Sequence, residues 1–169
     1  MEQLLPLSRG VDESSNILEP LNCLIQFNDR ATQTDAAWAI SYITDSSGDH
    51  AKAVCATNNM VPTLISHIAT CGDDKLITPS LRAVGNIITG ADDLTQFCLE
   101  NGFLQCVKVL FEMRKKNILK EACWALSNVT AGTKQQVQAV VDFGLIPTVI
   151  NLLHHTDYKI QKVNIFEGF

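Results

Sequence analysis

Three pairs of side chains could together bind an extended basic peptide. An asparagine amide carries both a donor and an acceptor, so it can pair with the N–H and C=O groups of a peptide backbone. A tryptophan face packs along the aliphatic stem of Lys or Arg and attracts its charged head, an interaction of about 0.5–2 kcal/mol. Residues i and i+4 of a helix lie on one face, one turn apart. The pairs with this spacing are Trp38 with Tyr42, Arg82 with Asn86, and Trp124 with Asn128.

The three pairs belong to an internal repeat. The segments that carry them align without gaps, and their first position moves from 38 to 82 to 124, steps of 44 and 42 residues. A second set of segments repeats with steps of 43 and 42 residues. Two independent segments that keep one period indicate repeated structural units. The first set is 34–43, 78–87 and 120–129, and the second is 59–65, 102–108 and 144–150.

The second set of segments predicts where helices end and begin. Asn59, Gly102 and Gly144 share one position, and these residue types tolerate the left-handed conformation that ends a helix. Pro62 and Pro147 follow, and they suit the first turn of the next helix, where a missing N–H costs nothing. Each unit is therefore predicted to be a short helix, a sharp turn, a second helix, a loop and a third helix. The last unit should place its first two helices at 135–142 and 146–153.

A period of about 40–47 residues with two or three helices is typical of armadillo and HEAT repeats. We predict an all-α fold, an armadillo-repeat right-handed superhelix (α-solenoid) with third helices lining a concave groove. The alanine, valine, isoleucine and leucine residues between the paired positions should pack inward. The predicted boundaries are an irregular segment 1–14, a partial repeat 15–46, complete repeats 47–90 and 91–132, and a partial, truncated repeat 133–169.

Composition excludes several classes of function. The net charge of −5 argues against a nucleic-acid binder, which needs a basic face. No apolar run is long enough to cross a membrane. The six cysteines lack metal-ligand spacing and are predicted to be small buried hydrophobes, so we expect no metal or cofactor. Enzymes of the hydrolase or transferase type are not supported, because the chain has no G-x-S-x-G, P-loop or H-E-x-x-H motif. His154 and His155 could bind metal, but we favour an exposed helix end.

The paired residues also have a purely structural interpretation. A tryptophan at helical spacing is usually part of the core, and an asparagine near a helix end is often a cap. Because the pairs recur in register in three repeats, we favour a role in the groove. Glu121 lies one turn before Trp124 and could meet a cationic side chain there. Arg82 is open to two interpretations, a surface charge or the partner of an acidic neighbour in the groove.

Three stretches closely resemble importin-α (karyopherin-α): 38–45 with its Trp and Tyr, 81–90 with its Arg and Asn, and 120–132 with its Trp and Asn. The resemblance covers roughly residues 17–162. In that family the order Trp/Tyr, Arg/Asn, Trp/Asn belongs to the fifth, sixth and seventh armadillo repeats. The resemblance therefore implies a non-enzymatic nuclear import adaptor, found in cytoplasm and nucleus, that binds proteins carrying Lys/Arg-rich nuclear localisation signals.

The resemblance also assigns candidate site residues. Tyr42 and Arg82 should lie in the region between the family's two signal-binding stretches, and Trp38 is a further peptide-binding candidate in the same row. The minor stretch should be lined by Asn86, Ile88, Thr89, Gly90, Thr95, Glu121, Trp124, Ser127 and Asn128.

The chain departs from the family pattern in three ways. It has no Arg/Lys-rich N-terminal segment, so we do not expect it to engage importin-β by that route, and it lacks the first four repeats. Counting 42 residues from Trp124 gives Phe166, and 163–169 contains neither a tryptophan nor a suitably placed asparagine, so the minor site should lack one wall. The alternative is a truncated or generic armadillo scaffold that binds another extended peptide without transport activity.

Overall fold

The computed structural model describes residues 13–113 and 115–153. These residues form ten α-helices and no strand, which confirms the all-α prediction. The tail at 163–169, His154 and His155 lie outside the described residues. The helices are α1 (Glu13–Gln26), α2 (Arg30–Ser46), α3 (Gly48–Ala56), α4 (Met60–Thr70), α5 (Asp74–Ile88), α6 (Asp92–Glu100), α7 (Phe103–Met113), α8 (Lys116–Thr130), α9 (Lys134–Asp142) and α10 (Ile146–Leu153).

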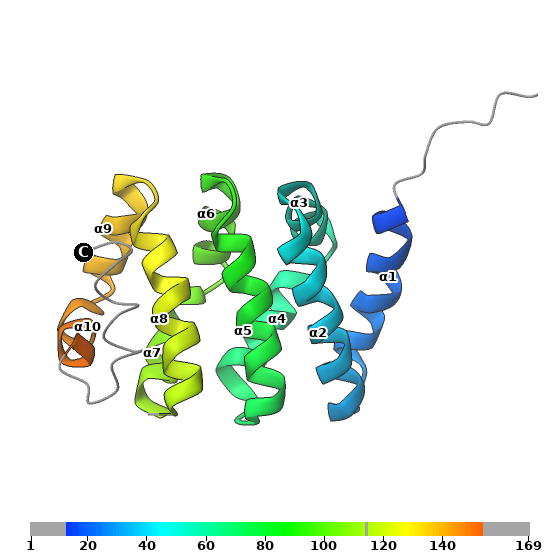
Figure 1. Ribbon diagram of the computed structural model, residues 1–169, viewed down its shortest axis with the longest axis horizontal. Helices are drawn as coiled ribbons and strands as arrows, with labels where there is room; N and C mark the ends of the chain where they lie inside the picture. The colour runs from blue at the N-terminus through cyan, green and yellow to red at the C-terminus, as the bar shows by residue number, and fades with distance from the viewer. Residues whose placement is uncertain (1–12, 114, 154–169) are drawn as a thin grey trace, which may run out of the picture.

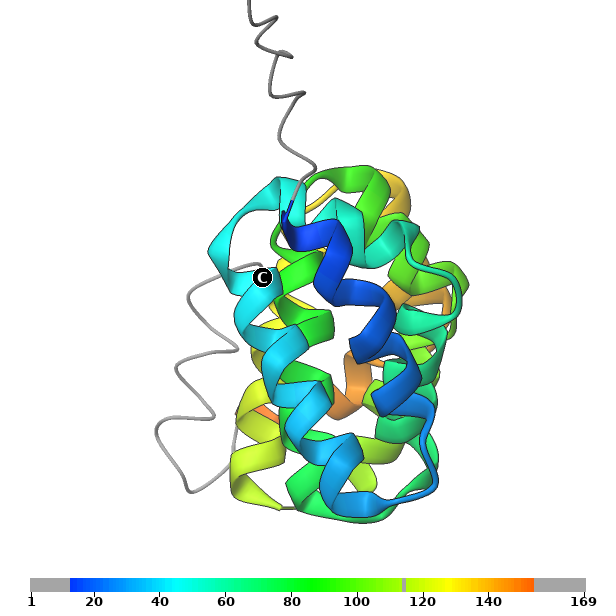
Figure 2. The same ribbon diagram turned by 90° about the vertical axis from the view of Figure 1, so that its right-hand side faces the viewer.

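The helices stack in parallel rows along one axis (Figure 1). Helices α2, α5 and α8 form one row, in which α5 contacts both neighbours, and α1, α4 and α7 form a second. Helices α3 and α6 contact each other in a third row. Figure 2, viewed from the α1 end, shows the later helices lying behind α1 and α2. Each helix row is thus built from one helix of every unit, as a solenoid requires.

The turns before α4, α7 and α10 have the predicted left-handed backbone. Asn59, Gly102 and Gly144 have φ angles of 59°, 93° and 80°. Pro62 and Pro147 lie in the first turns of α4 and α10, as predicted. Helix α10 has the predicted bounds, and α9 begins one residue earlier than predicted because Thr133 and Gln136 form a capping box at its start.

The apolar residues between the paired positions form much of the core. Ile40, Val84 and Leu126, which belong to the row formed by α2, α5 and α8, are buried in the core. Their alanine neighbours Ala83 and Ala125 are fully buried as well, whereas Ala39 is only half-buried. The inward packing predicted from the spacing is therefore confirmed, with one partial exception. No helix among the described residues is long and apolar enough to cross a membrane.

The cysteines differ in exposure. Cys98, Cys106 and Cys123 are buried, as predicted. The prediction is wrong for Cys23, which is exposed, and Cys55 and Cys71 are half-buried. Burial raises the pKa of the Cys106 thiol to about 11, and burial likewise raises the pKa of the Cys98 thiol. Within the described residues, no group of His, Cys, Asp or Glu side chains could hold a metal ion.

Thiol alkylation checks this assignment. Only the thiolate is nucleophilic, and at pH about 8 a thiol with a pKa near 11 is roughly one part in a thousand ionised. We expect iodoacetamide to modify Cys23 rapidly in the native chain and to leave Cys98 and Cys106 unmodified until denaturant is added. Peptide mass spectrometry gives the site of modification. Labelling of Cys106 at the rate of Cys23 in native buffer would contradict the burial described.

Candidate functional site

The predicted site residues lie mainly on α2, α5 and α8, which run side by side in Figure 1. On α2, the rings of Trp38 and Tyr42 are stacked, with centroids 6.1 Å apart and an angle of 26° between planes. Tyr42 is 68% exposed, and Trp38 is half-buried. The first pair therefore presents an aromatic surface to solvent, as a site for the aliphatic stem of a basic side chain needs.

Arg82 pairs with Glu121 across the boundary between two repeats. Its Nε donates to Glu121 Oε2 at 2.8 Å, and its Nη2 donates to Glu121 Oε1 at 2.7 Å. Such two-point pairing is among the stronger hydrogen-bonding arrangements in proteins. The hydrogen bond to Glu121 raises the pKa of Arg82, which favours the charged form of its guanidinium. Of the two interpretations of Arg82, the structure shows the second, a partner for an acidic neighbour.

Asn86 also bonds to the preceding repeat. Its Nδ2 donates to the Ser41 carbonyl oxygen at 3.0 Å and to Thr44 Oγ1 at 3.3 Å, and the residue is only 7% exposed. These bonds attach α5 to the end of α2. The amide donor of Asn86 is thus engaged within the chain rather than presented to solvent.

Asn128 occupies the corresponding position on α8 but has a different environment. Its Nδ2 is buried and, among the described residues, has no hydrogen-bond partner. When the repeats are aligned, Ile88 is the residue that corresponds to Thr44. Asn128 therefore has no hydroxyl acceptor where Thr44 accepts a hydrogen bond from Asn86. An unsatisfied buried donor costs about 1–3 kcal/mol, and a ligand carbonyl could remove that cost.

Trp124 packs directly on Gly85 of α5. A Cβ atom at Gly85 would clash with the six-membered ring of Trp124, so only glycine permits this close approach. Sequence reasoning did not single out Gly85. The alignment of the repeats could have indicated it, because Gly85 corresponds to Ser41 and Ser127 and is the one of the three without a side chain.

Two cavities lie between α5 and α8. The larger, of about 270 Å³, is lined by Asp45, Arg82, Asn86, Lys120, Glu121 and Trp124. The smaller, of about 170 Å³, is lined by Ile88, Thr89, Gly90, Asp92, Thr95, Asn128, Ala131 and Gly132. Nine of the predicted residues thus gather at two neighbouring hollows of one repeat boundary.

The remaining predicted residues lie elsewhere. Trp38 lines a separate hollow of about 410 Å³ together with Thr34, Asp74, Lys75 and Thr78. Ser127 is buried, and its Oγ donates to the Trp124 carbonyl oxygen at 2.8 Å.

Sequence reasoning missed Asp45, Asp92 and Lys120 as lining residues of the two cavities. Asp45 lies seven residues after Trp38, two helical turns along the same face, and that spacing was the signal for it.

Comparison with known proteins defines the class of the fold. The family model described as Armadillo/beta-catenin-like repeat matches residues 133–163. An engineered protein of known structure superposes with a TM-score of 0.81 at 28% identity, covering 88% of this chain and 60% of that one. A designed armadillo repeat protein in complex with the peptide (KR)4 superposes with a TM-score of 0.84 at 22% identity, covering 88% and 62%. The chain is an armadillo-repeat protein.

Sequence relatives define the family. Importin subunit alpha-1a of Oryza sativa subsp. japonica is 40% identical over 141 residues, 83% of this chain and 26% of that protein. Importin subunit alpha-4 of Arabidopsis thaliana is 43% identical over 139 residues, 82% of this chain and 26% of that protein. The chain belongs to the importin-α family, and it spans about a quarter of the length of these relatives.

Replacement of Gly85 by alanine tests the close packing of Trp124. The added Cβ requires the indole to move, at an overpacking cost of about 1–3 kcal/mol that a helix preference of about 1 kcal/mol partly offsets. In a Trp38→Phe background, where Trp124 is the remaining tryptophan, we expect a shifted emission maximum and a lower melting temperature.

Gly48→Ala is the matched control, because nothing lies within 4 Å of a Cβ built there. We expect that variant to leave the emission of Trp124 unchanged. An unchanged spectrum for Gly85→Ala would show that the ring does not lie on Gly85.

Proposed function

We propose that this chain binds Lys/Arg-rich nuclear localisation peptides in the groove formed by α2, α5 and α8, and that it serves as part of a nuclear import adaptor of cytoplasm and nucleus. The observation that carries the proposal is the boundary between α5 and α8, where the Glu121 carboxylate and the Trp124 indole line one cavity. A carboxylate beside an aromatic face is the environment that a Lys or Arg side chain needs. Membership of the importin-α family supports the assignment.

The groove charges also support a cationic ligand. Asp45 and Glu121 line the larger cavity, and Asp92 lines the smaller one. Lys120 and Arg82 are the basic residues among the linings of these two cavities, and Arg82 is already paired. A peptide with two or more basic side chains could place one at each hollow, and a backbone carbonyl of that peptide is a suitable acceptor for the Asn128 amide, which is unpaired within the described part of the chain.

The ion pair of Arg82 and Glu121 sets a condition on binding. Glu121 already accepts two hydrogen bonds from the Arg82 guanidinium, which balances its charge, so a peptide cation must share the carboxylate with Arg82. Arg82 therefore acts as an internal competitor for the carboxylate, and a ligand must offer a comparable cation. This requirement disfavours neutral peptides and favours strongly basic ones.

Titration of a fluorescent lysine-rich localisation peptide tests the proposed function. We expect saturable binding that weakens with salt, because cationic side chains meet acidic ones. Trp124→Ala and Asn128→Ala should each weaken it by about 1–3 kcal/mol, with helicity by circular dichroism nearly unchanged.

A peptide with its lysines replaced by glutamates, and Val109→Ala on exposed α7 surface, serve as controls. Unaltered affinity in both groove variants would place the peptide elsewhere and overturn the groove assignment.

Substitution of Arg82 tests the internal competition. Arg82→Gln frees the Glu121 carboxylate and removes a positive charge, so affinity for the lysine-rich peptide should rise by roughly tenfold, about 1.4 kcal/mol. Glu121→Gln should lower affinity instead, and isothermal calorimetry gives both values. Weaker binding by Arg82→Gln would mean that the arginine contacts the peptide favourably, contrary to the competition described.

A further inference from the structure

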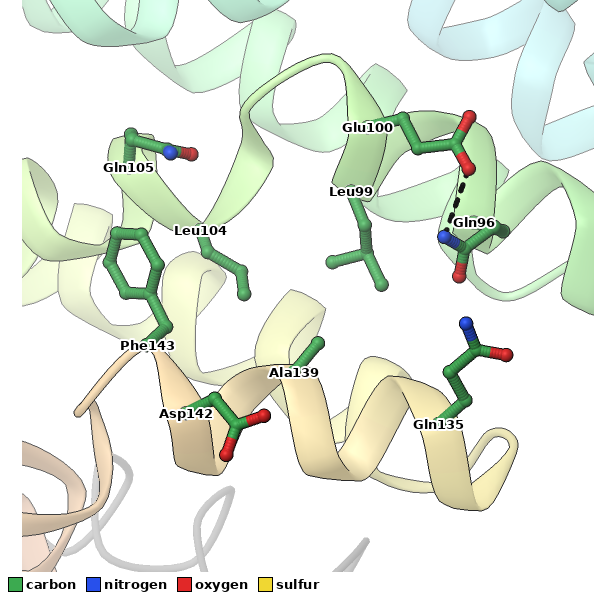
Figure 3. A pocket seen from close by; sticks show the side chains of 9 residues that line it. All are labelled: Gln96, Leu99, Glu100, Leu104, Gln105, Gln135, Ala139, Asp142 and Phe143. Carbon is green, nitrogen blue, oxygen red and sulfur yellow. Dashed lines mark hydrogen bonds between the residues drawn. The ribbon is translucent and has the colours of Figure 1, made fainter.

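A hollow of about 420 Å³ lies outside the groove, between α6, α7 and α9 (Figure 3). Its apolar lining consists of Leu99, Leu104, Ala139 and Phe143. Leu104 is buried, while the other three are half-buried and pack against the core. The hollow lies beside α6 and α9, which pack more loosely on each other than α3 and α6 do one repeat earlier. It therefore offers an apolar depression that the chain itself does not fill.

The two charged residues that line this hollow are both acidic. Glu100 ends α6 and Asp142 ends α9, so each carboxylate lies where its helix dipole is also negative. No basic residue lies in the last turn of either helix. A negative charge at a helix C-terminus is unfavourable, and a cation bound beside each carboxylate would offset that repulsion.

Both carboxylates have only neutral partners within the part of the chain that the structure describes. Glu100 accepts a hydrogen bond from Gln96 Nε2 at 3.0 Å, and Asp142 accepts one from Gln138 Nε2 at 2.7 Å. The described ion pairs join Arg82 with Glu121 and Lys115 with Asp74, so neither hollow carboxylate takes part in one. Their charge remains available to an external cation.

The order of these groups defines the ligand. In Figure 3, Glu100 and Asp142 lie at opposite ends of the hollow, and Leu99, Leu104 and Ala139 lie between them. A complementary ligand has an apolar centre and a positive charge on each side. We propose that the hollow binds a polypeptide segment of a partner protein in which leucine-like side chains are flanked on both sides by arginine or lysine.

Other occupants fit the charges less well. Nucleic acid and anionic lipid would be repelled by two carboxylates at helix C-termini, and a second copy of this chain would bring a net charge of −5. The hollow is lined from α6, α7 and α9, whereas the candidate groove residues lie mainly on α2, α5 and α8. Both surfaces could therefore be occupied at the same time, and the proposal does not depend on the proposed function of the groove.

The test uses the full 169-residue chain and a fluorescein-labelled, capped peptide with a central Leu-Leu pair between two flanking Arg-Arg pairs. We expect saturable binding by fluorescence anisotropy. Peptides with the leucines changed to serine, or the arginines to glutamate, should bind at least tenfold more weakly. Absence of saturable binding of the first peptide overturns the proposal.

Variants locate the site. Ala139→Arg places bulk and positive charge in the hollow and should weaken binding at least tenfold, whereas Val141→Arg adds the same charge at an exposed position of α9 that does not line the hollow. The milder double variant Glu100→Gln/Asp142→Asn should weaken binding several-fold and reduce its salt dependence.

Because this peptide is basic enough to enter the groove as well, the same variants are also compared in a Trp124→Ala background, in which saturable binding to the hollow should persist. Equal losses in Ala139→Arg and Val141→Arg, or loss of binding in Trp124→Ala, would overturn the proposal, the latter because it places the peptide in the groove. No effect of the double variant would overturn it as well.

Discussion

The packing of α5 between α2 and α8 is the contact on which the rest of the structure depends. Eleven of the fifteen residues of α5 are buried, so this helix depends on packing against neighbouring helices on both of its sides. A repeat unit cannot cover its own apolar faces, and stacking them is what removes that surface from water. Because the same core positions recur in each third helix, stacking also brings the paired positions into one row.

The same stacking determines which polar groups remain free for a ligand. The bonds from Asn86 to Ser41 and Thr44, and the Arg82–Glu121 pair, join consecutive repeats. Trp124 packs on Gly85 in the same way. The proposed peptide site is thus built largely from the residues that hold the repeats together, so binding and stability are coupled at this boundary. Asn128 is the exception, since its amide donor has no described partner.

Sequence patterns predicted the features that depend on local geometry. The left-handed turns at Asn59, Gly102 and Gly144, the bounds of α10 and the inward packing of Val84 and Leu126 each follow from spacing and backbone preference. The cross-repeat contacts could not be predicted in this way, because they depend on how far each repeat rotates relative to the next.

That rotation decides that Arg82 reaches Glu121 and that Gly85 faces Trp124. The hollow beside Ala139 could not be predicted either, since its lining comes from three helices of two different repeats. The repeat boundaries and the site assignments as a set stay predictions.

The chain has two tryptophans, Trp38 and Trp124, and their indole N–H resonances give the most direct test of the central claim. A titration with a lysine-rich localisation peptide followed by nitrogen–proton correlation NMR reports on both. If the peptide binds between α5 and α8, the Trp124 indole signal shifts along a saturable curve that matches the affinity measured by fluorescence. Saturable binding with an unmoved Trp124 signal would contradict the claim that this repeat boundary is the peptide site.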